Sequence, residues 1–93
     1  YKEQYPTILL GDFNSEANDT SAVIQKMFAI KDVGNAAFNV DKIENTFDSK
    51  SPHKRIDYIF YSENSIEYIS GKVLNEFEQA SDHLPVFMEF KLK

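Results

Sequence analysis

The chain has 93 residues, a net charge of −5 and no cysteine. That length suits one small domain with a single core, and a content of 42% apolar and 14% aromatic residues excludes an intrinsically disordered chain. The lack of cysteine excludes disulfides and thiolate-bound metals. No apolar run approaches the roughly 20 residues that span a bilayer, so we expect no membrane span.

The first residue is Tyr1 rather than methionine. We therefore expect the chain to be part of a longer protein, with any targeting segment upstream, which leaves its localisation unknown. The negative charge argues only weakly against a polyanionic partner. Three of the carboxylates, at Asp12, Asp57 and Asp82, are assigned below to a site that would hold a cation, and without them the chain is close to neutral.

The first predicted element is a short buried strand over residues 7–10, which ends at Gly11. Asp12 and Asn14 follow it, at the end of a strand where ligands commonly bind in α/β proteins. Positions two apart point to the same side, so this carboxylate and this amide could reach one bound group. The alternative is that Gly-Asp-Phe-Asn forms only a turn, because Gly, Asp and Asn are common turn residues.

The next predicted element is a surface helix over residues 22–29, with Asp19 or Thr20 as its N-cap. Four apolar side chains share one face and are expected to pack in the core: Val23, Ile24, Met27 and Phe28. Residues 31–35 are interpreted as the exit turn. Residues 36–51 show no clear pattern beyond a short extended piece at 45–47.

The clearest strand covers residues 56–61, with apolar side chains on both faces. Asp57 is the exception, and a carboxylate buried there requires a hydrogen-bond partner. That partner could be backbone or tyrosine groups alone. Beyond it we predict a turn at 62–65, a strand or a pair of strands at 66–74 with a bend at Gly71, an acidic loop at 75–80 and a strand at 85–92.

A loop just before the last strand carries Ser-Asp-His-Leu-Pro-Val at residues 81–86. Asp82 and His83 place an acidic ligand next to a titratable imidazole. Such a pair is by itself common on protein surfaces. Its significance depends on the other two motifs.

Three motifs occur in order: Gly-Asp-Phe-Asn at 11–14, Arg-Ile-Asp-Tyr-Ile-Phe at 55–60 and Ser-Asp-His-Leu-Pro-Val at 81–86. Together they resemble the second half of the endonuclease/exonuclease/phosphatase superfamily, over about residues 7–92. The resemblance implies an α+β fold: one mixed, mostly antiparallel sheet with one main helix, half of a four-layer α/β/β/α sandwich. Residues 1–93 would form the C-terminal half of such a domain.

The activity that this resemblance implies is hydrolysis of a phosphate ester by a water that Mg²⁺, or alternatively Mn²⁺, activates for in-line attack. Asp12 resembles the residue that orients or deprotonates that water, and Asn14 the one that hydrogen-bonds the water or a phosphoryl oxygen. His83 resembles the imidazole that stabilises charge on the phosphorus, and Asp57 the carboxylate that holds it. Asp82, with Asp12, resembles a metal ligand.

Elementary chemistry supports these roles. Phosphoryl transfer needs charge neutralisation and positioning, which an oriented imidazole and Mg²⁺ provide, and Mg²⁺ takes only one or two carboxylates. A carboxylate bonded to a ring nitrogen raises the pKa of the imidazole and fixes its tautomer. Asp57 would thereby find its partner, and we expect His83 to be largely protonated near neutral pH.

The motifs of the family's first half, including an Asn and the principal Glu metal ligand, do not occur in this sequence. We therefore expect the missing N-terminal half of the domain to be a partner, and the isolated chain to bind Mg²⁺ poorly and to be nearly inactive. The inner sheet face would be exposed, which predicts self-association.

Two alternatives to an enzyme remain open at this point: a non-catalytic binding or interaction module with the same fold, and an unrelated α+β domain. The substrate class is also open among nucleic acid, phospholipid and sugar phosphate. A basic patch could meet phosphates or simply be solvated, and consists of Lys50, His53, Lys54 and Arg55.

Overall fold

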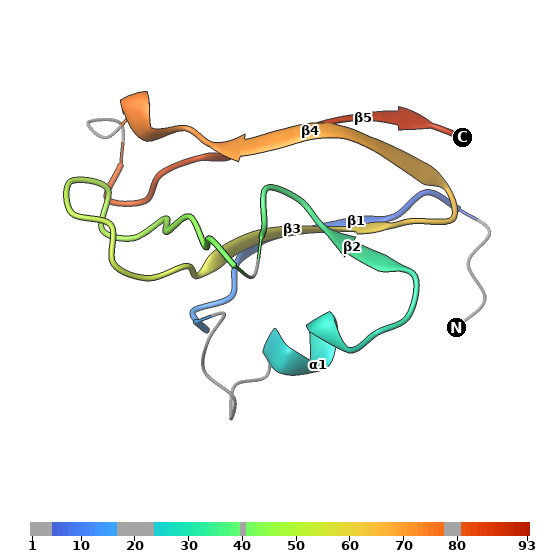
Figure 1. Ribbon diagram of the computed structural model, residues 1–93, viewed down its shortest axis with the longest axis horizontal. Helices are drawn as coiled ribbons and strands as arrows, with labels where there is room; N and C mark the ends of the chain where they lie inside the picture. The colour runs from blue at the N-terminus through green and yellow to red at the C-terminus, as the bar shows by residue number, and fades with distance from the viewer. Residues whose placement is uncertain (1–4, 17–23, 40, 78–80) are drawn as a thin grey trace.

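The computed structural model describes residues 5–16, 24–39, 41–77 and 81–93, which form two antiparallel sheets, one α-helix and one 3₁₀ turn (Figure 1). The first sheet contains three strands in the order β1-β3-β2. Their bounds are Ile8–Asp12 for β1, Val33–Asn35 for β2 and Asp57–Ser62 for β3. The central strand β3 is buried on both faces at Tyr58, Ile59 and Phe60, as its apolar sequence predicts.

The short strand β2 corrects the sequence interpretation, which assigned residues 31–35 to an exit turn. Val33 pairs with Ser62 and Asn35 with Phe60, so the segment forms the second edge of the sheet. Gly and Asn suggested a turn because both are turn formers. Here Gly34 is required for another reason: a Cβ at this position would collide with the ring of Tyr61.

The second sheet is a ribbon of two strands, β4 at Ile66–Val73 and β5 at Val86–Leu92. The register between them is irregular between Tyr68 and Ser70, and Gly71, where we predicted a bend, pairs with Met88. β4 follows β3 through a tight turn but does not pair with it. Both edges of β3 are already occupied, by β1 and by β2.

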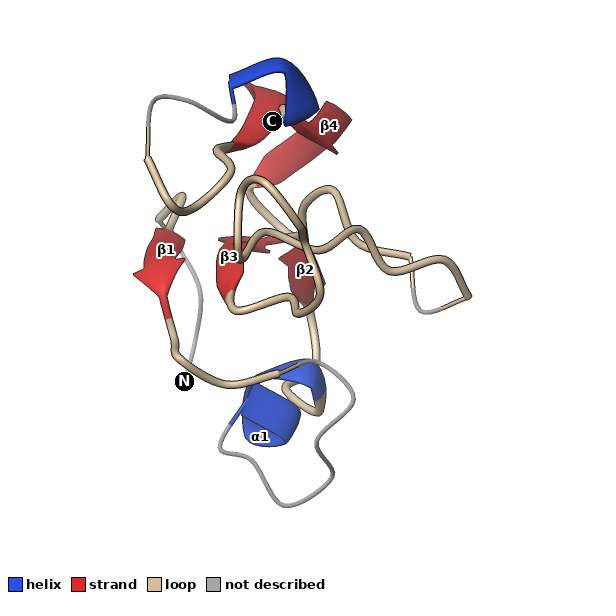
Figure 2. Ribbon diagram, turned by 90° about the vertical axis from the view of Figure 1, so that its left-hand side faces the viewer, coloured by secondary structure: helices blue, strands red, loops and turns tan. Residues whose placement is uncertain are grey.

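The three-stranded sheet lies between the β4–β5 ribbon on one face and the helix α1, Ile24–Phe28, on the other (Figure 2). On the helix side, Ile24, Tyr58 and Phe60 form the buried core cluster. Six partly buried side chains pack against this cluster: Phe13, Met27, Phe28, Val33, Phe38 and Ile43. The predicted core role of the helix face is therefore confirmed, while Val23 and both N-cap candidates lie outside the described residues.

The ribbon contacts the other face of the sheet through a stacked pair of rings. Tyr61 of β3 and Tyr68 of β4 have centroids 5.5 Å apart and planes 6° apart. Tyr68 also accepts, through its hydroxyl oxygen, a hydrogen bond from the backbone N–H of Ala37. This contact covers part of the sheet face that was expected to be free.

The predicted α+β class is confirmed, with antiparallel strands divided between two sheets rather than joined in one. The expected acidic loop at 75–80 begins as a 3₁₀ turn, Asn75–Phe77, and its remaining residues lie outside the described part of the chain. Within the described residues, no helix has the length and apolar character needed to cross a membrane.

Large apolar side chains remain exposed at the outer strands of both sheets. Leu10 on β1 is 65% exposed and Leu92 on β5 is 60% exposed, and Leu9, Phe87 and Phe90 are also exposed. Soluble monomers seldom leave such surface uncovered when it is contiguous. We propose that copies of the chain associate through these strands.

This proposal predicts that sedimentation velocity will give a mass above the 10.7 kDa of the single chain, rising with protein concentration. Leu92→Lys should weaken the association because it places a charge in the apolar contact. Lys91→Gln, at an exposed polar position of the same strand, is the matched control and should leave it unchanged. A single species of 10.7 kDa at every concentration would contradict the proposal.

Candidate functional site

The site begins where β1 ends, at Gly11 and Asp12. Gly11 has a φ of 148°, a backbone conformation that L side chains rarely adopt. Phe13 then turns into the core, where its ring lies edge-on to those of Tyr58 and Phe60, and its N–H donates to the carbonyl of Ile56. This anchor leaves Asp12 exposed at the end of the strand.

Asp12 and Asp57 lie directly opposite each other on the antiparallel strands β1 and β3. Two like charges at such a pair destabilise a sheet unless a cation separates them. Asp57 is partly buried, whereas Asp12 is exposed. The strand register therefore creates a strongly acidic position at the end of the sheet.

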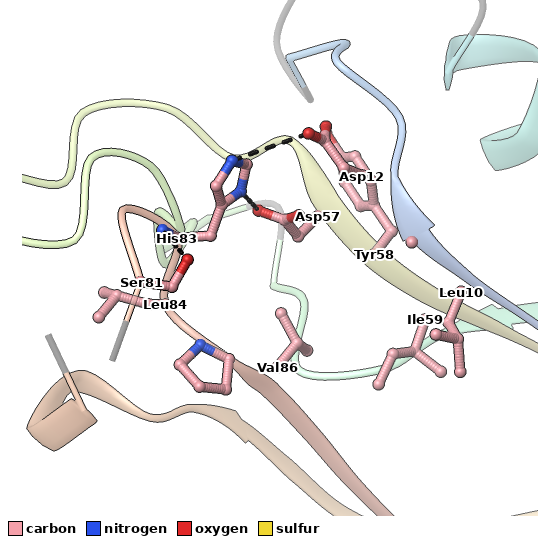
Figure 3. Close-up of a pocket in the computed structure, with 11 residues that line it drawn as sticks. Leu10, Asp12, Asp57, Tyr58, Ile59, Ser81, His83, Leu84 and Val86 are labelled. Atoms are coloured by element: carbon pink, nitrogen blue, oxygen red, sulfur yellow. Dashed lines mark hydrogen bonds and ion pairs between the residues drawn. The ribbon is translucent and has the colours of Figure 1, made fainter. Parts of the chain in front are cut away.

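His83 lies between these two carboxylates (Figure 3). Its Nδ1 is 2.8 Å from Oδ2 of Asp57, and its Nε2 is 3.8 Å from Oδ2 of Asp12. An ionised carboxylate only accepts hydrogen bonds, so Nδ1 carries the proton in this bond. The partner that the burial of Asp57 demanded is thus the imidazole of His83.

The other two predicted residues lie at the edge of this arrangement. The carboxylate of Asp82 is 4.0 Å from Nε2 of His83 and is well exposed. Asn14 has a φ of 50°, and its backbone N–H donates to Oδ1 of Asp12 at 2.8 Å. Within the described residues, the structure gives its side-chain amide no hydrogen bond to Asp12, Asp57 or His83. Of the five predicted side chains, three carboxylates therefore gather around the imidazole of the fourth, His83.

Asp12, Asp57 and His83 line one end of an open cleft of about 380 Å³ between β1, β3 and the start of β5. Its wall below the rim is apolar and is formed by Leu10, Ile59, Leu84, Pro85 and Val86. The polar groups are therefore concentrated at one end of the cleft. A ligand there would meet both carboxylates and the imidazole.

The hydrogen bond to Asp57 raises the pKa of His83 above its ordinary value, and the carboxylates of Asp57, Asp12 and Asp82 add to the effect, while burial opposes it. Tyr58 is unsuited to proton transfer near neutral pH because burial raises its pKa to about 12. The hydroxyl of Tyr58 lies 2.7 Å from the carbonyl oxygen of Arg55. Of these two side chains, His83 is therefore the one suited to exchange a proton near neutral pH.

Three groups could hold a metal ion, since one ligand atom from each of Asp12, Asp57 and His83 lies within 4.8 Å of the others. The Nδ1 of His83 is already used by Asp57. The oxygens of Asp12 and Asp82 both face Nε2 and are exposed. Water-exposed carboxylates such as these are ligands of the kind that Mg²⁺ prefers, since it binds oxygen and keeps several waters.

A sequence model of the Endonuclease/Exonuclease/phosphatase family matches residues 2–83. The chain belongs to this family. The match includes all five predicted site residues, and the family consists of phosphoesterases and nucleases, which are hydrolases. Neither a search of curated proteins nor a search of solved structures returned a match to this chain.

In this family member, Arg55 is not part of a basic patch. Its side chain is 1% exposed, and it donates hydrogen bonds to the backbone carbonyls of Ala36, Ala37, Glu44 and Asp57. From sequence we grouped it with Lys50, His53 and Lys54. The carbonyl groups that allow Arg55 to be buried come mostly from residues 36–44, so the sequence around Arg55 does not indicate its burial. The guanidinium instead holds the loop of residues 36–44 against the start of β3.

The remaining basic residues lie outside the cleft wall. His53 is an exposed loop residue, as expected, with Nδ1 3.1 Å from the carbonyl oxygen of Ser51. The ammonium group of Lys54 lies 5.2 Å from the ring centroid of Phe47.

Sequence reasoning missed three residues in the segment before β3 that hold the His83 loop in place. Ser49 donates from its hydroxyl to the carbonyl of Ser81 and from its N–H to that of Asp82. The ring of Phe47 packs 5.0 Å from that of His83, and Thr46 is fully buried. The extended piece predicted at 45–47 was the one signal for this segment.

We predict that an NMR titration will give His83 a pKa above 6.5, and that Asp57→Asn will lower it toward that value. The exposed Asp41→Asn, outside the cleft, is the matched control and should have no effect. Because the folded-state pKa is raised, the contribution of His83 to stability is fully present below about pH 6.5 and lost as the pH rises through the folded-state pKa. A pKa of His83 below 6 would contradict this.

Proposed function

We propose that this chain supplies the acid–base and phosphate-binding groups of a Mg²⁺-dependent phosphoesterase, which hydrolyses a phosphodiester or phosphomonoester by in-line attack of an activated water. The observation that carries the proposal is the line from Asp57 through His83 to Asp12 at the rim of one cleft. Membership in a family of phosphoesterases and nucleases supports the reaction class. Nucleic acids, phospholipids and sugar phosphates all carry the group on which such a site acts.

In this proposal Asp12 orients and deprotonates the attacking water. Its two oxygens have different surroundings, because Oδ1 accepts the N–H of Asn14 while Oδ2 faces His83. The backbone hydrogen bond fixes the plane of the carboxylate and leaves one oxygen for the water. Asn14, which is exposed beside it, would donate a hydrogen bond from its amide to a phosphoryl oxygen or to the same water.

His83 would act as a cationic hydrogen-bond donor to the phosphoryl group. Asp57 holds Nδ1, so Nε2 is the nitrogen on the side of Asp12 that is left for a ligand (Figure 3). The hydrogen bond to Asp57 raises the pKa of His83, which favours the charged ring. A fixed positive donor stabilises the negative charge that develops on the phosphoryl oxygens during the reaction.

Asp12 and Asp82 would hold the Mg²⁺, or alternatively Mn²⁺. The ion, when bound, neutralises charge on the phosphate and lowers the pKa of a bound water. Two exposed carboxylates give an incomplete set of ligands, so we propose that the principal Glu ligand belongs to an N-terminal half of the domain. The isolated chain would then bind the ion weakly and turn over little substrate.

The catalytic roles predict that, in a protein that joins this chain to such an N-terminal half, Asp12→Asn or His83→Ala will lower kcat by about 10²–10⁴. The assay is hydrolysis of bis(p-nitrophenyl) phosphate in the presence of Mg²⁺. Asp41→Asn should leave kcat unchanged. Wild-type turnover by either of the first two variants would refute the assigned roles.

The metal assignment can be tested on the chain itself with Mn²⁺, whose unpaired electrons broaden nearby NMR signals. We expect the amide signals of Asp12, Asp82 and His83 to broaden first, and Asp12→Ala to suppress the effect. The control is again Asp41→Asn, which should broaden as the wild type does. Broadening that is uniform over the surface, or centred elsewhere, would exclude Asp12 and Asp82 as ligands.

A further inference from the structure

The residue that joins the two sides of the candidate site is Thr46, which takes no part in the chemistry described above. It is 0% exposed and lies between the start of β3 and the loop that carries His83. Its backbone N–H donates to the carbonyl of Lys54. A buried polar side chain needs hydrogen-bond partners, and those of the Thr46 hydroxyl are backbone groups at the start of β3, next to the site.

The hydroxyl of Thr46 binds the strand that presents Asp57. Oγ1 accepts the backbone N–H groups of Ile56 and Asp57, each at 3.3 Å. Ile56 is buried, so its N–H has little access to water as a substitute. A hydroxyl at this position therefore fixes the backbone from which the Asp57 carboxylate projects.

The main chain of Thr46 binds the loop that presents His83. Its carbonyl oxygen accepts the N–H of Leu84, the residue after His83, at 2.7 Å. Leu84 is itself 2% exposed, which fixes the loop at that point. Phe47, which follows Thr46 in the chain, packs its ring against the imidazole of His83. One residue thus holds the backbone of both partners in the Asp57–His83 hydrogen bond.

We propose that Thr46 is a positioning residue that sets the separation between the Asp57 carboxylate and the His83 imidazole. Its relevance to catalysis rests on the proposed function, but the geometric role does not. Ser49 donates to Ser81 and Asp82, on the His83 side of the site. Thr46 hydrogen-bonds to both sides, through its hydroxyl to the N–H of Asp57 and through its carbonyl to the N–H of Leu84.

Two substitutions distinguish the contribution of the Thr46 hydroxyl from that of its methyl group. Thr46→Val keeps the shape and the carbonyl bond to Leu84 but removes the acceptor of the Ile56 and Asp57 N–H groups. Thr46→Ser removes only a methyl group and keeps that acceptor. The two variants therefore differ in the one interaction that the proposal depends on.

The experiment is NMR on the 93-residue chain at a fixed pH of 6, with the Nδ1–H proton of His83 and the backbone amide exchange rates as readouts. In the wild type, the bond to Asp57 should give a downfield, slowly exchanging Nδ1–H signal. Thr46→Val should shift this signal upfield or broaden it beyond detection, and should raise the exchange rates of Ile56 and Asp57 about tenfold. Thr46→Ser should match the wild type in both.

A Thr46→Val variant with an unchanged Nδ1–H signal would overturn the proposal, as would a Thr46→Ser variant that loses it. If Thr46→Val does not fold, Thr46→Cys takes its place, because sulfur is a weaker acceptor and the same losses are expected. Asp41→Asn, at an exposed position outside the cleft, is the control and should leave the exchange rates of Ile56 and Asp57 unchanged. None of these readouts needs catalytic turnover, so a failure of the proposed function would be seen separately.

Discussion

The hydrogen bond between Nδ1 of His83 and the carboxylate of Asp57 is the interaction on which the rest of the site depends. The pairing of β1 with β3 sets two aspartates directly opposite each other, an arrangement that repulsion would otherwise disfavour. A protonated imidazole between them relieves this repulsion. The two carboxylates in turn raise the pKa of the imidazole and so favour its protonated form. The charge of the ring and the orientation of Nε2 toward Asp12 therefore both depend on one contact.

Buried polar residues outside the cleft maintain that contact. Arg55 donates to four backbone carbonyls and so attaches a loop without regular structure to the start of β3. Thr46 and Ser49 attach the His83 loop to the same region. Each of these side chains satisfies backbone groups that would otherwise be costly to bury, so stability and site geometry depend on the same hydrogen bonds.

The sequence was sufficient to predict the α+β class, the central strand and the identity of the residues that meet at its end. The burial of Asp57 in an apolar strand already required a partner, and the third motif offered His83. The sequence did not predict β2, because Val-Gly-Asn has the local character of a turn and becomes a strand only through pairing with β3. It also did not predict the roles of Arg55 and Thr46, since their partners lie far away in the sequence or belong to the backbone.

The central claim is that Asp57 and His83 are energetically coupled through a charge-assisted hydrogen bond. A double-mutant cycle with Asp57→Asn and His83→Gln, measured as the free energy of unfolding of the four proteins at pH 6, tests this most directly. We predict a coupling free energy of about 1–3 kcal/mol, which falls as the pH rises and the imidazole loses its proton. A coupling within about 0.3 kcal/mol of zero at pH 6, which is the usual limit of additivity for independent sites, would contradict the account.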